Sequence, residues 1–202
     1  MRLLMASSNP AKLKEFRVLA AAQPSIELDA LPDFSRLPAF DESAPTFAEN
    51  AAGKALHFSR FTNLPIFADD SGLAVSALRR APGVHSARYA GENASDADRV
   101  AKLLSELRAS GSSDRRARFV CVLALARQGR ILAVFSDAVE GEIAPSPRGA
   151  GGFGYDPVFL IPSLGKTFSE LPNDAKNLHS HRGKAFRKLL SYLAETPRSD
   201  SV

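Results

Sequence analysis

The sequence predicts an α/β protein with a mixed sheet, and three observations lead to this fold class. Short apolar segments typical of strands alternate with segments whose apolar residues recur every three or four positions, as they do in helices. The two kinds of segment are intermixed along the chain, which is the order found in α/β proteins. A Gln128-Gly129 pair between two apolar segments is a hairpin signal, so the sheet has antiparallel as well as parallel strands.

Five segments have the apolar composition of strands. They span residues 3–6, 65–68, 118–126, 131–139 and 158–161. The second of them is expected to stop at two adjacent carboxylates, Asp69 and Asp70. The stretch 144–156 is rich in Pro and Gly and runs straight into the last strand, so we interpret it as a functional loop.

Four helices are predicted from apolar spacing and from start signals. Pro10 stands near the start of the first helix, where its fixed φ is favourable. Thr46 and Glu49 form a capping box for the second helix, which runs to about residue 61. Ser95 or Asp96 caps the third. The apolar faces of the first, third and last helices are Leu13, Phe16 and Leu19; Val100, Leu103, Leu104 and Leu107; and Phe186, Leu189, Leu190 and Leu193.

The composition indicates one globular domain over residues 1–195 and a flexible polar tail at 196–202. The formal net charge of +4 would suit nucleic acid or a small polyanion such as a nucleotide, and it also fits scattered surface charges. Cys121 lies in an apolar run and is expected to be a small buried side chain. The first residues lack the layout of a signal peptide, and no apolar run approaches the ~20 residues of a membrane helix. The cytoplasm is therefore the expected compartment.

A candidate phosphate site lies between the first strand and the first helix. It consists of Ser7, Ser8, Asn9, Pro10, Ala11 and Lys12. Backbone N–H groups at a helix start attract anions, and the hydroxyls and the lysine add further donors. Ordinary helix capping by Ser and Asn explains the same residues without any ligand, so both interpretations stand.

A candidate metal site lies in Asp69-Asp70-Ser71-Gly72. Two adjacent carboxylates repel each other, and a hard divalent cation such as Mg2+ offsets that repulsion with oxygen ligands. Neighbouring residues of an extended segment point to opposite sides, so one aspartate can bind the metal while the other orients it. Glu42 could complete the site. The alternatives are a polar turn for the aspartates and a solvated loop charge for Glu42.

Two further segments have polar and aromatic groups suited to a purine base. Residues 149–154 fit G-x-G-x-x-G, but a strand follows them instead of a helix, so a dinucleotide fold is excluded. Phe153 and Tyr155 could stack on a base and Asp156 could accept from its ring N–H groups, or the aromatics pack in the core. Lys176, His179, His181 and Arg182 could bind phosphate or a base carbonyl, or they form a surface basic patch; no His or Cys cluster supports zinc.

Taken together, these motifs resemble those of the inosine/xanthosine triphosphate pyrophosphatases, the Ham1-like family. The motifs are SSNPAKLKE, TFAENAAGKA, FADDSGL, APGVHSARYAGE, GGFGYDPVF and SHRGKA, in that order from about Leu3 to Leu193. The resemblance implies a mixed, strongly twisted sheet flanked by helices, with two lobes and a central cleft. It also implies a homodimer.

The resemblance implies an activity: Mg2+-dependent hydrolysis of the triphosphates of inosine, deoxyinosine and xanthosine to the monophosphate and pyrophosphate. That activity removes deaminated purines from the nucleotide pool. By position, the residues Ser7 to Lys12 would hold the triphosphate, with Lys54 as a further phosphate ligand. Asp70 would be the general base and a metal ligand, and Glu42 and Asp69 would help to bind or orient Mg2+.

The same resemblance assigns the recognition of the substrate base. Ser71 would touch the substrate, and the base would be bound and recognised by Phe153, Gly154, Tyr155, Asp156, Lys176, His181 and Arg182. The chain departs from the family pattern at Ser8, at Ala44-Pro45 and at Arg99, where asparagine is common. None of these departures removes a charged group assigned to the chemistry.

Two alternatives remain. The first is a related pyrophosphatase that acts on modified pyrimidine or methylated nucleotides, and the SHRGKA segment argues against it. The second is a nucleotide-binding or RNA-binding protein without catalysis, which leaves Asp69 and Asp70 unexplained. We therefore expect a small-molecule nucleotide substrate and no stable nucleic-acid partner.

Overall fold

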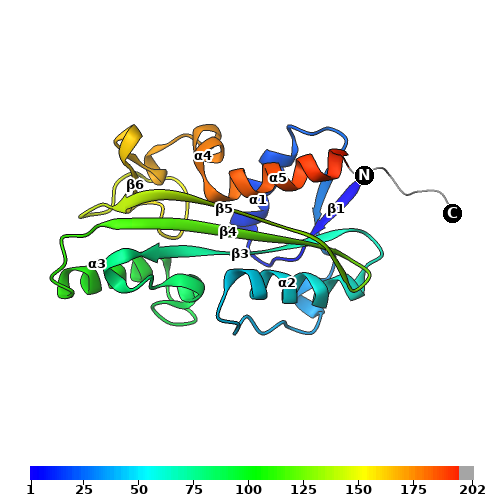
Figure 1. Ribbon diagram of the computed structural model, residues 1–202, viewed down its shortest axis with the longest axis horizontal. Helices are drawn as coiled ribbons and strands as arrows, with labels where there is room; N and C mark the ends of the chain where they lie inside the picture. The colour runs from blue at the N-terminus through cyan, green and yellow to red at the C-terminus, as the bar shows by residue number, and fades with distance from the viewer. Residues whose placement is uncertain (196–202) are drawn as a thin grey trace. The chain divides into compact units, whose positions relative to one another are not determined.

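A seven-stranded sheet with the strand order β2-β1-β3-β4-β5-β6-β7 organises the chain (Figure 1). The computed structural model describes residues 1–195, so the tail predicted at 196–202 lies outside the described residues. The strands are β1 (Arg2–Met5), β2 (Glu27–Ala30), β3 (Ile66–Val75), β4 (Arg116–Arg127), β5 (Arg130–Ile143), β6 (Phe159–Ile161) and β7 (Lys166–Thr167). The helices are α1 (Pro10–Ala20), α2 (Phe47–Phe58), α3 (Asp96–Ala109), α4 (Asn173–His179) and α5 (His181–Glu195).

The register of the strands confirms the predicted mixed sheet. Strand β1 is parallel to β2 and to β3, with Leu4 opposite Ile66. Strand β6 is antiparallel to both β5 and β7, and its Leu160 lies opposite Thr167. Strands β4 and β5 are joined by Gln128-Gly129, and both of these residues have a positive φ, as the tight turn of a hairpin requires.

The predicted helix starts are also confirmed. Asn9 caps α1, with its side-chain oxygen accepting from two backbone N–H groups of the first turn, and Pro10 is the first helical residue. Thr46 caps α2 by accepting from the Glu49 N–H. Ser95 caps α3 in a full capping box with Asp98.

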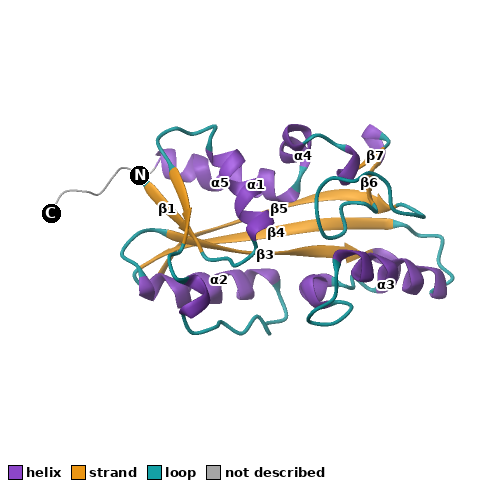
Figure 2. Cartoon of the chain, turned by 180° about the vertical axis from the view of Figure 1, so that it is seen from behind, coloured by secondary structure: helices purple, strands orange, loops and turns teal. Residues whose placement is uncertain are grey.

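The described chain divides into two compact units, and the first contains α1, α2 and α5. Its described residues are 1–69, 122–136 and 182–195. Helices α1 and α5 lie together on one face of its strands and α2 lies on the other (Figures 1 and 2). Phe16, Phe67 and Phe186 join α1, β3 and α5, with ring centroids 5.0–5.4 Å apart.

The second unit comprises residues 70–121 and 137–181. Residues of α3 form part of its hydrophobic core. The predicted apolar face of α3 is buried, as are the rings of Phe119, Phe159 and Phe168. The centroid of Phe159 lies 4.6 Å from that of Phe119 and 5.2 Å from that of Phe168. Tyr155 belongs to the same core.

One predicted boundary is wrong, since β3 does not stop before Asp69. The strand runs for ten residues, through both aspartates to Val75. The Asp-Ser-Gly sequence is typical of a turn, but Leu73 and Val75 beyond it are fully buried, and their burial in the second unit favours a continued strand. The two carboxylates therefore lie in the middle of a strand.

Three elements were absent from the sequence-based prediction. Strand β2 has one buried residue, Leu28, and β7 has only two residues, so neither carries a periodic signal. Lys176 and His179 lie in a separate short helix, α4, because Ser180 is extended and breaks the path to α5. No helix among residues 1–195 is long and apolar enough to span a bilayer.

Candidate active site

The turn between β1 and α1 presents the candidate phosphate residues. The Asn9 side chain accepts from the N–H groups of Ala11 at 3.0 Å and Lys12 at 3.1 Å, and the Asn9 N–H donates to Ser7 Oγ at 3.2 Å. Capping is therefore the structural role of Asn9, while Ser8 is exposed. The turn combines a helix N-terminus with an accessible hydroxyl, which suits an anion.

Asp69 is the most buried charged group of this region, and a lysine of α1 pairs with it. Its exposed fraction is 0%, and Lys12 Nζ lies 2.7 Å from Asp69 Oδ2. Burial raises the pKa of Asp69, but the charges of Lys12, Lys54 and Arg182 and the hydrogen bond from Lys12 outweigh it, so the pKa lies below its ordinary value. The carboxylate is therefore charged.

The other two cations near Asp69 are each paired with a second carboxylate. Lys54 of α2 lies 2.6 Å from Glu42 Oε1. Arg182, in the first turn of α5, donates to Glu15 Oε2 of α1 at 3.2 Å. Cations from three helices thus face one buried aspartate in the first unit. Fixed positive charges in such a partly dry environment stabilise an incoming polyanion more strongly than they would in water.

The candidate metal ligands are only partly brought together. Asp70 follows Asp69 in extended backbone, so the two side chains leave β3 on opposite sides, and Asp70 is 7% exposed. Asp69 and Glu42 are both in ion pairs with lysines. Within residues 1–195 no three His, Cys, Asp or Glu side chains are close enough together to hold a metal ion.

The glycine-rich loop before β6 is built around a buried ion pair. Lys176 Nζ lies 2.6 Å from Asp156 Oδ2, and both side chains are almost fully buried. The same carboxylate oxygen accepts from the Phe153 N–H at 2.8 Å, and Lys176 Nζ lies 4.9 Å from the centroid of the Phe153 ring. A side chain at Gly152 would overlap Asp156, so the close approach of the backbone requires glycine there.

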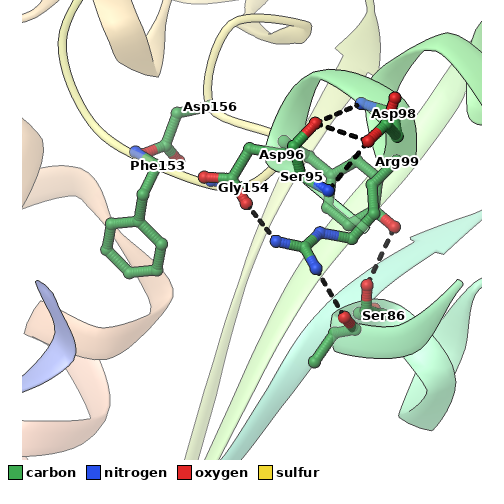
Figure 3. Close-up of polar contacts among 10 residues, drawn as sticks. Ser86, Ser95, Asp96, Asp98, Arg99, Phe153, Gly154 and Asp156 are labelled. Atoms are coloured by element: carbon green, nitrogen blue, oxygen red, sulfur yellow. Dashed lines mark hydrogen bonds and ion pairs between the residues drawn. The ribbon is translucent and has the colours of Figure 1, made fainter. Parts of the chain in front are cut away.

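The two residues after Phe153 connect the loop to other elements of the second unit. The Gly154 N–H donates to Asp96 Oδ2 at 2.6 Å, and Figure 3 shows these residues together. Tyr155 Oη donates to the Ser86 carbonyl at 3.0 Å, and its burial raises the pKa of the phenol. The Tyr155 ring lies in the core, as the core interpretation of the aromatics predicts, while Phe153 is half-buried.

The cationic residues before and within α5 do not form a surface patch, so that alternative is wrong. Lys176, His181 and Arg182 are 3%, 1% and 8% exposed. The His181 ring stacks on Phe119 with centroids 4.6 Å apart and an interplanar angle of 9°. His179 and Ser71 are half-buried. Burying three basic side chains costs free energy, because they lose contact with water, and an exposed basic patch would not have this cost.

Sequence reasoning missed three residues of this arrangement. Glu15 pairs with Arg182, although 167 positions separate them, so no spacing could predict the contact. Asp96 and Arg99 support Gly154, but the sequence alone indicates only a possible helix cap at Asp96 and a departure from the family pattern at Arg99. Ser95 and Asp96 were alternative caps, and because Ser95 caps α3, the Asp96 carboxylate is left to bind the loop.

Comparison with known proteins gives consistent similarities over nearly the whole chain. The sequence profile of the Ham1 family matches residues 3–192. A dITP/XTP pyrophosphatase of Geobacillus kaustophilus is 50% identical over 187 residues, which cover 93% of this chain and 91% of that protein. A HAM1 protein structure from Coxiella burnetii has a TM-score of 0.88 at 45% identity, covering 97% of this chain and 100% of that one. The Staphylococcus aureus Ham1 structure has a TM-score of 0.84 at 39% identity, covering 96% and 98%.

Proposed function

The chain belongs to the Ham1 family, and from this premise we propose that it hydrolyses noncanonical purine nucleoside triphosphates to the monophosphate and pyrophosphate. The substrates are the triphosphates of inosine, deoxyinosine and xanthosine. The observation that carries the proposal is the buried Asp69 faced by Lys12, Lys54 and Arg182, in a chain of this family. Such a set of charges suits a triphosphate.

The phosphate-binding residues come from the first unit. They are Ser7, Ser8, Asn9, Pro10, Ala11, Lys12 and Lys54. Hydrolysis of a triphosphate requires the phosphates to be positioned and the negative charge that develops on their oxygens to be neutralised. The N-terminus of α1 and the two lysines supply donors and charge for both tasks.

The family implies a divalent metal cation, and we assign it as Mg2+, with Asp70 as a ligand and with Glu42 and Asp69 helping to bind or orient it. The donor chemistry fits, because Mg2+ prefers carboxylate oxygens and is usually shared with substrate phosphates. When bound, the cation would supply positive charge to the phosphate oxygens. Lys12 and Lys54, which neutralise Asp69 and Glu42 here, would then be available to the phosphates.

Asp70 is the general base in this proposal. It accepts a proton from the attacking water as that water adds to phosphorus and the bond between the α- and β-phosphates breaks. Its position suits the task, because β3 holds the side chain in a nearly buried place with little freedom to move. Asp69, on the other side of the strand, is already engaged by Lys12.

Base recognition belongs to the loop of the second unit together with the basic residues near α5. Its residues are Ser71, Phe153, Gly154, Tyr155, Asp156, Lys176, His181 and Arg182. A 6-oxo purine offers an acceptor at O6 and a donor at N1, and adenine reverses both. The buried Lys176 can only donate, so the amino group of adenine would place a donor against it where O6 of a 6-oxo purine offers an acceptor, which gives strong discrimination.

The setting of the activity completes the proposal. The enzyme acts on free nucleotides in the cytoplasm, without a stable nucleic-acid partner, and it works as a homodimer. The resemblance to the Ham1 family supports the homodimer. The compartment is supported by the substrate, which is a free nucleotide.

The proposal is tested by measuring pyrophosphate release from inosine triphosphate, ATP and GTP, each with Mg2+ and with a chelator. We expect strong release from the inosine substrate with Mg2+, little from ATP, whose base edge is reversed, and none with chelator. GTP has the same 6-oxo edge as the inosine substrate, so its turnover measures whether the 2-amino group is excluded. Equal turnover of all three nucleotides would contradict the assigned base recognition. Binding of inosine triphosphate without any turnover would favour the noncatalytic alternative.

A further inference from the structure

We propose that Asp96 and Arg99 are positioning residues that hold the base-binding loop, residues 152–156, in its working conformation. Neither residue is assigned a role in the proposed chemistry. The inference rests on the proposed function, because it concerns the residues assigned there to the base. Its structural part, the attachment of the loop to α3, can be measured separately.

Asp96 is free to act on the loop because the N-terminus of α3 is already capped. The Asp98 N–H donates to Ser95 Oγ at 3.1 Å, and the Ser95 N–H donates to Asp98 Oδ2 at 2.9 Å. Asp96 takes no part in this capping box. Its Oδ2 instead accepts from the Gly154 N–H at 2.6 Å, and its Oδ1 is paired with the Arg99 guanidinium (Figure 3).

Arg99 joins α3 to a second support of the loop. One terminal nitrogen of its guanidinium pairs with Asp96, and the other donates to the Ala87 carbonyl at 2.7 Å. Ala87 lies in the 3-10 helix Gly83–Arg88, whose Ser86 carbonyl accepts from Tyr155 Oη. Gly154 is thus bound by α3 and the neighbouring Tyr155 by the 3-10 helix, and Arg99 connects these two elements.

The second support is itself fixed to the sheet. Ser86 is buried, its Oγ accepts from the Leu73 N–H of β3 at 2.9 Å, and its hydroxyl donates to the Gly83 carbonyl at 2.6 Å. The ring of contacts through Asp96, Arg99 and Ser86 therefore connects the loop to both α3 and β3. A frame of this kind restricts the loop more than one hydrogen bond would.

The loop needs this support because its two glycines leave the backbone conformationally free. Gly152 and Gly154 have φ values of 74° and 63°, on either side of Phe153. The Phe153 N–H and its ring contact Asp156 and Lys176, so a shift of Gly154 would disturb that pair as well. Asp96 contributes a charge-assisted hydrogen bond to Gly154, which is stronger than a neutral one.

An ordinary helix ion pair is the alternative explanation, because Asp96 and Arg99 are three positions apart on α3. Exposed pairs of that kind contribute little. The bonds to Gly154 and Ala87 distinguish the two explanations, since a simple surface pair requires neither.

The test compares Asp96→Ala with Asp98→Ala, a matched control that removes the capping carboxylate of the same helix turn without touching the loop. The first readout is backbone hydrogen exchange of a peptide containing residues 153–156. The second is the separate measurement of KM and kcat for inosine triphosphate. Asp96→Asn, which keeps an oxygen acceptor, and Arg99→Met complete the series.

We expect Asp96→Ala to speed exchange of the loop and to raise KM by about tenfold, while kcat changes by less than about threefold, because a charged hydrogen bond that organises binding is lost. Arg99→Met should also speed loop exchange and raise KM. For Asp96→Asn, both values should lie between those of Asp96→Ala and the wild type, and Asp98→Ala should keep the wild-type loop exchange and KM.

The inference would be overturned if Asp96→Ala and Asp98→Ala had the same loop exchange and the same KM. Absence of turnover in the wild type would refute the proposed function instead, and loop exchange would still decide the role of Asp96.

Discussion

At the scale of single residues, the balance of charge around Asp69 explains why this carboxylate can be buried. The desolvation of a fully buried aspartate costs several kcal/mol unless cations offset it. Lys12 is the nearest of these cations, and Lys54 and Arg182 add to its effect. The arrangement stabilises the folded protein, and in the proposed function the same positive charges attract the triphosphate.

Removal of Lys12 should therefore destabilise the protein. We expect Lys12→Met to lower the free energy of unfolding by about 2 kcal/mol or more, because Asp69 would lose its nearest partner. Lys14→Met, an exposed lysine of the same helix, should change it by less than about 0.5 kcal/mol. Urea unfolding of both variants measures the difference, and equal small changes would contradict this account of Asp69.

Acid should weaken the contribution of Asp96. Burial raises the pKa of this carboxyl, but the hydrogen bonds from Arg99 and the Gly154 N–H and the charge of Arg99 outweigh it and hold the pKa below 3.8. A depressed pKa stabilises the fold above the unfolded value and loses that effect as the pH falls through the folded value.

The stability difference between the wild type and Asp96→Asn should accordingly be constant above about pH 5 and shrink as the pH falls below about 4. Thermal or urea unfolding over that range measures it. A difference that persists unchanged to about pH 2 would show that the pKa of Asp96 is not linked to folding in this way.

At the scale of elements, the loop before β6 depends on backbone conformations that few residues adopt. Gly152 has a φ of 74°, and a Cβ there would overlap the Asp156 carboxylate. Gly111, between α3 and β4, has a φ of 65° but open space where a Cβ would lie. A side chain at either position would be strained by the positive φ, but only at Gly152 would it also overlap another residue.

Gly152→Ala and Gly111→Ala should both lose about 1 kcal/mol of stability from that strain. Only Gly152→Ala should also raise KM for inosine triphosphate, because the added methyl group displaces Asp156 from Lys176. Steady-state kinetics beside unfolding curves separate the two effects. An unchanged KM in Gly152→Ala would mean that the loop can rearrange without loss of binding.

Local signals in the sequence predicted α1, α2, α3, α5 and the hairpin. The caps Asn9, Thr46 and Ser95 lie next to the residues that they bond, so their roles follow from short spacing. The course of β3 did not follow from spacing, since the turn-like Asp-Ser-Gly sequence is overridden by packing of the residues after it. Tertiary burial, which no local pattern encodes, decided that element.

At the scale of the whole molecule, the groups assigned to the substrate are distributed over distant parts of the chain. The cations that face Asp69 come from positions 12, 54 and 182, and the Asp156–Lys176 pair belongs to the other unit. Family motifs in the sequence could identify most of these residues. Their partners Glu15 and Asp96 became evident only from the fold, because contacts across the chain fix them.

The most direct measurement is a product analysis of inosine triphosphate turned over by the wild type and by Asp70→Asn, with the exposed Asp33→Asn as control. We expect equal amounts of pyrophosphate and inosine monophosphate from the wild type and from Asp33→Asn. The rate should be lower by about 100-fold to 10,000-fold in Asp70→Asn, because a general base is removed. Orthophosphate as the product would contradict the proposed reaction, and full turnover by Asp70→Asn would contradict the role of Asp70.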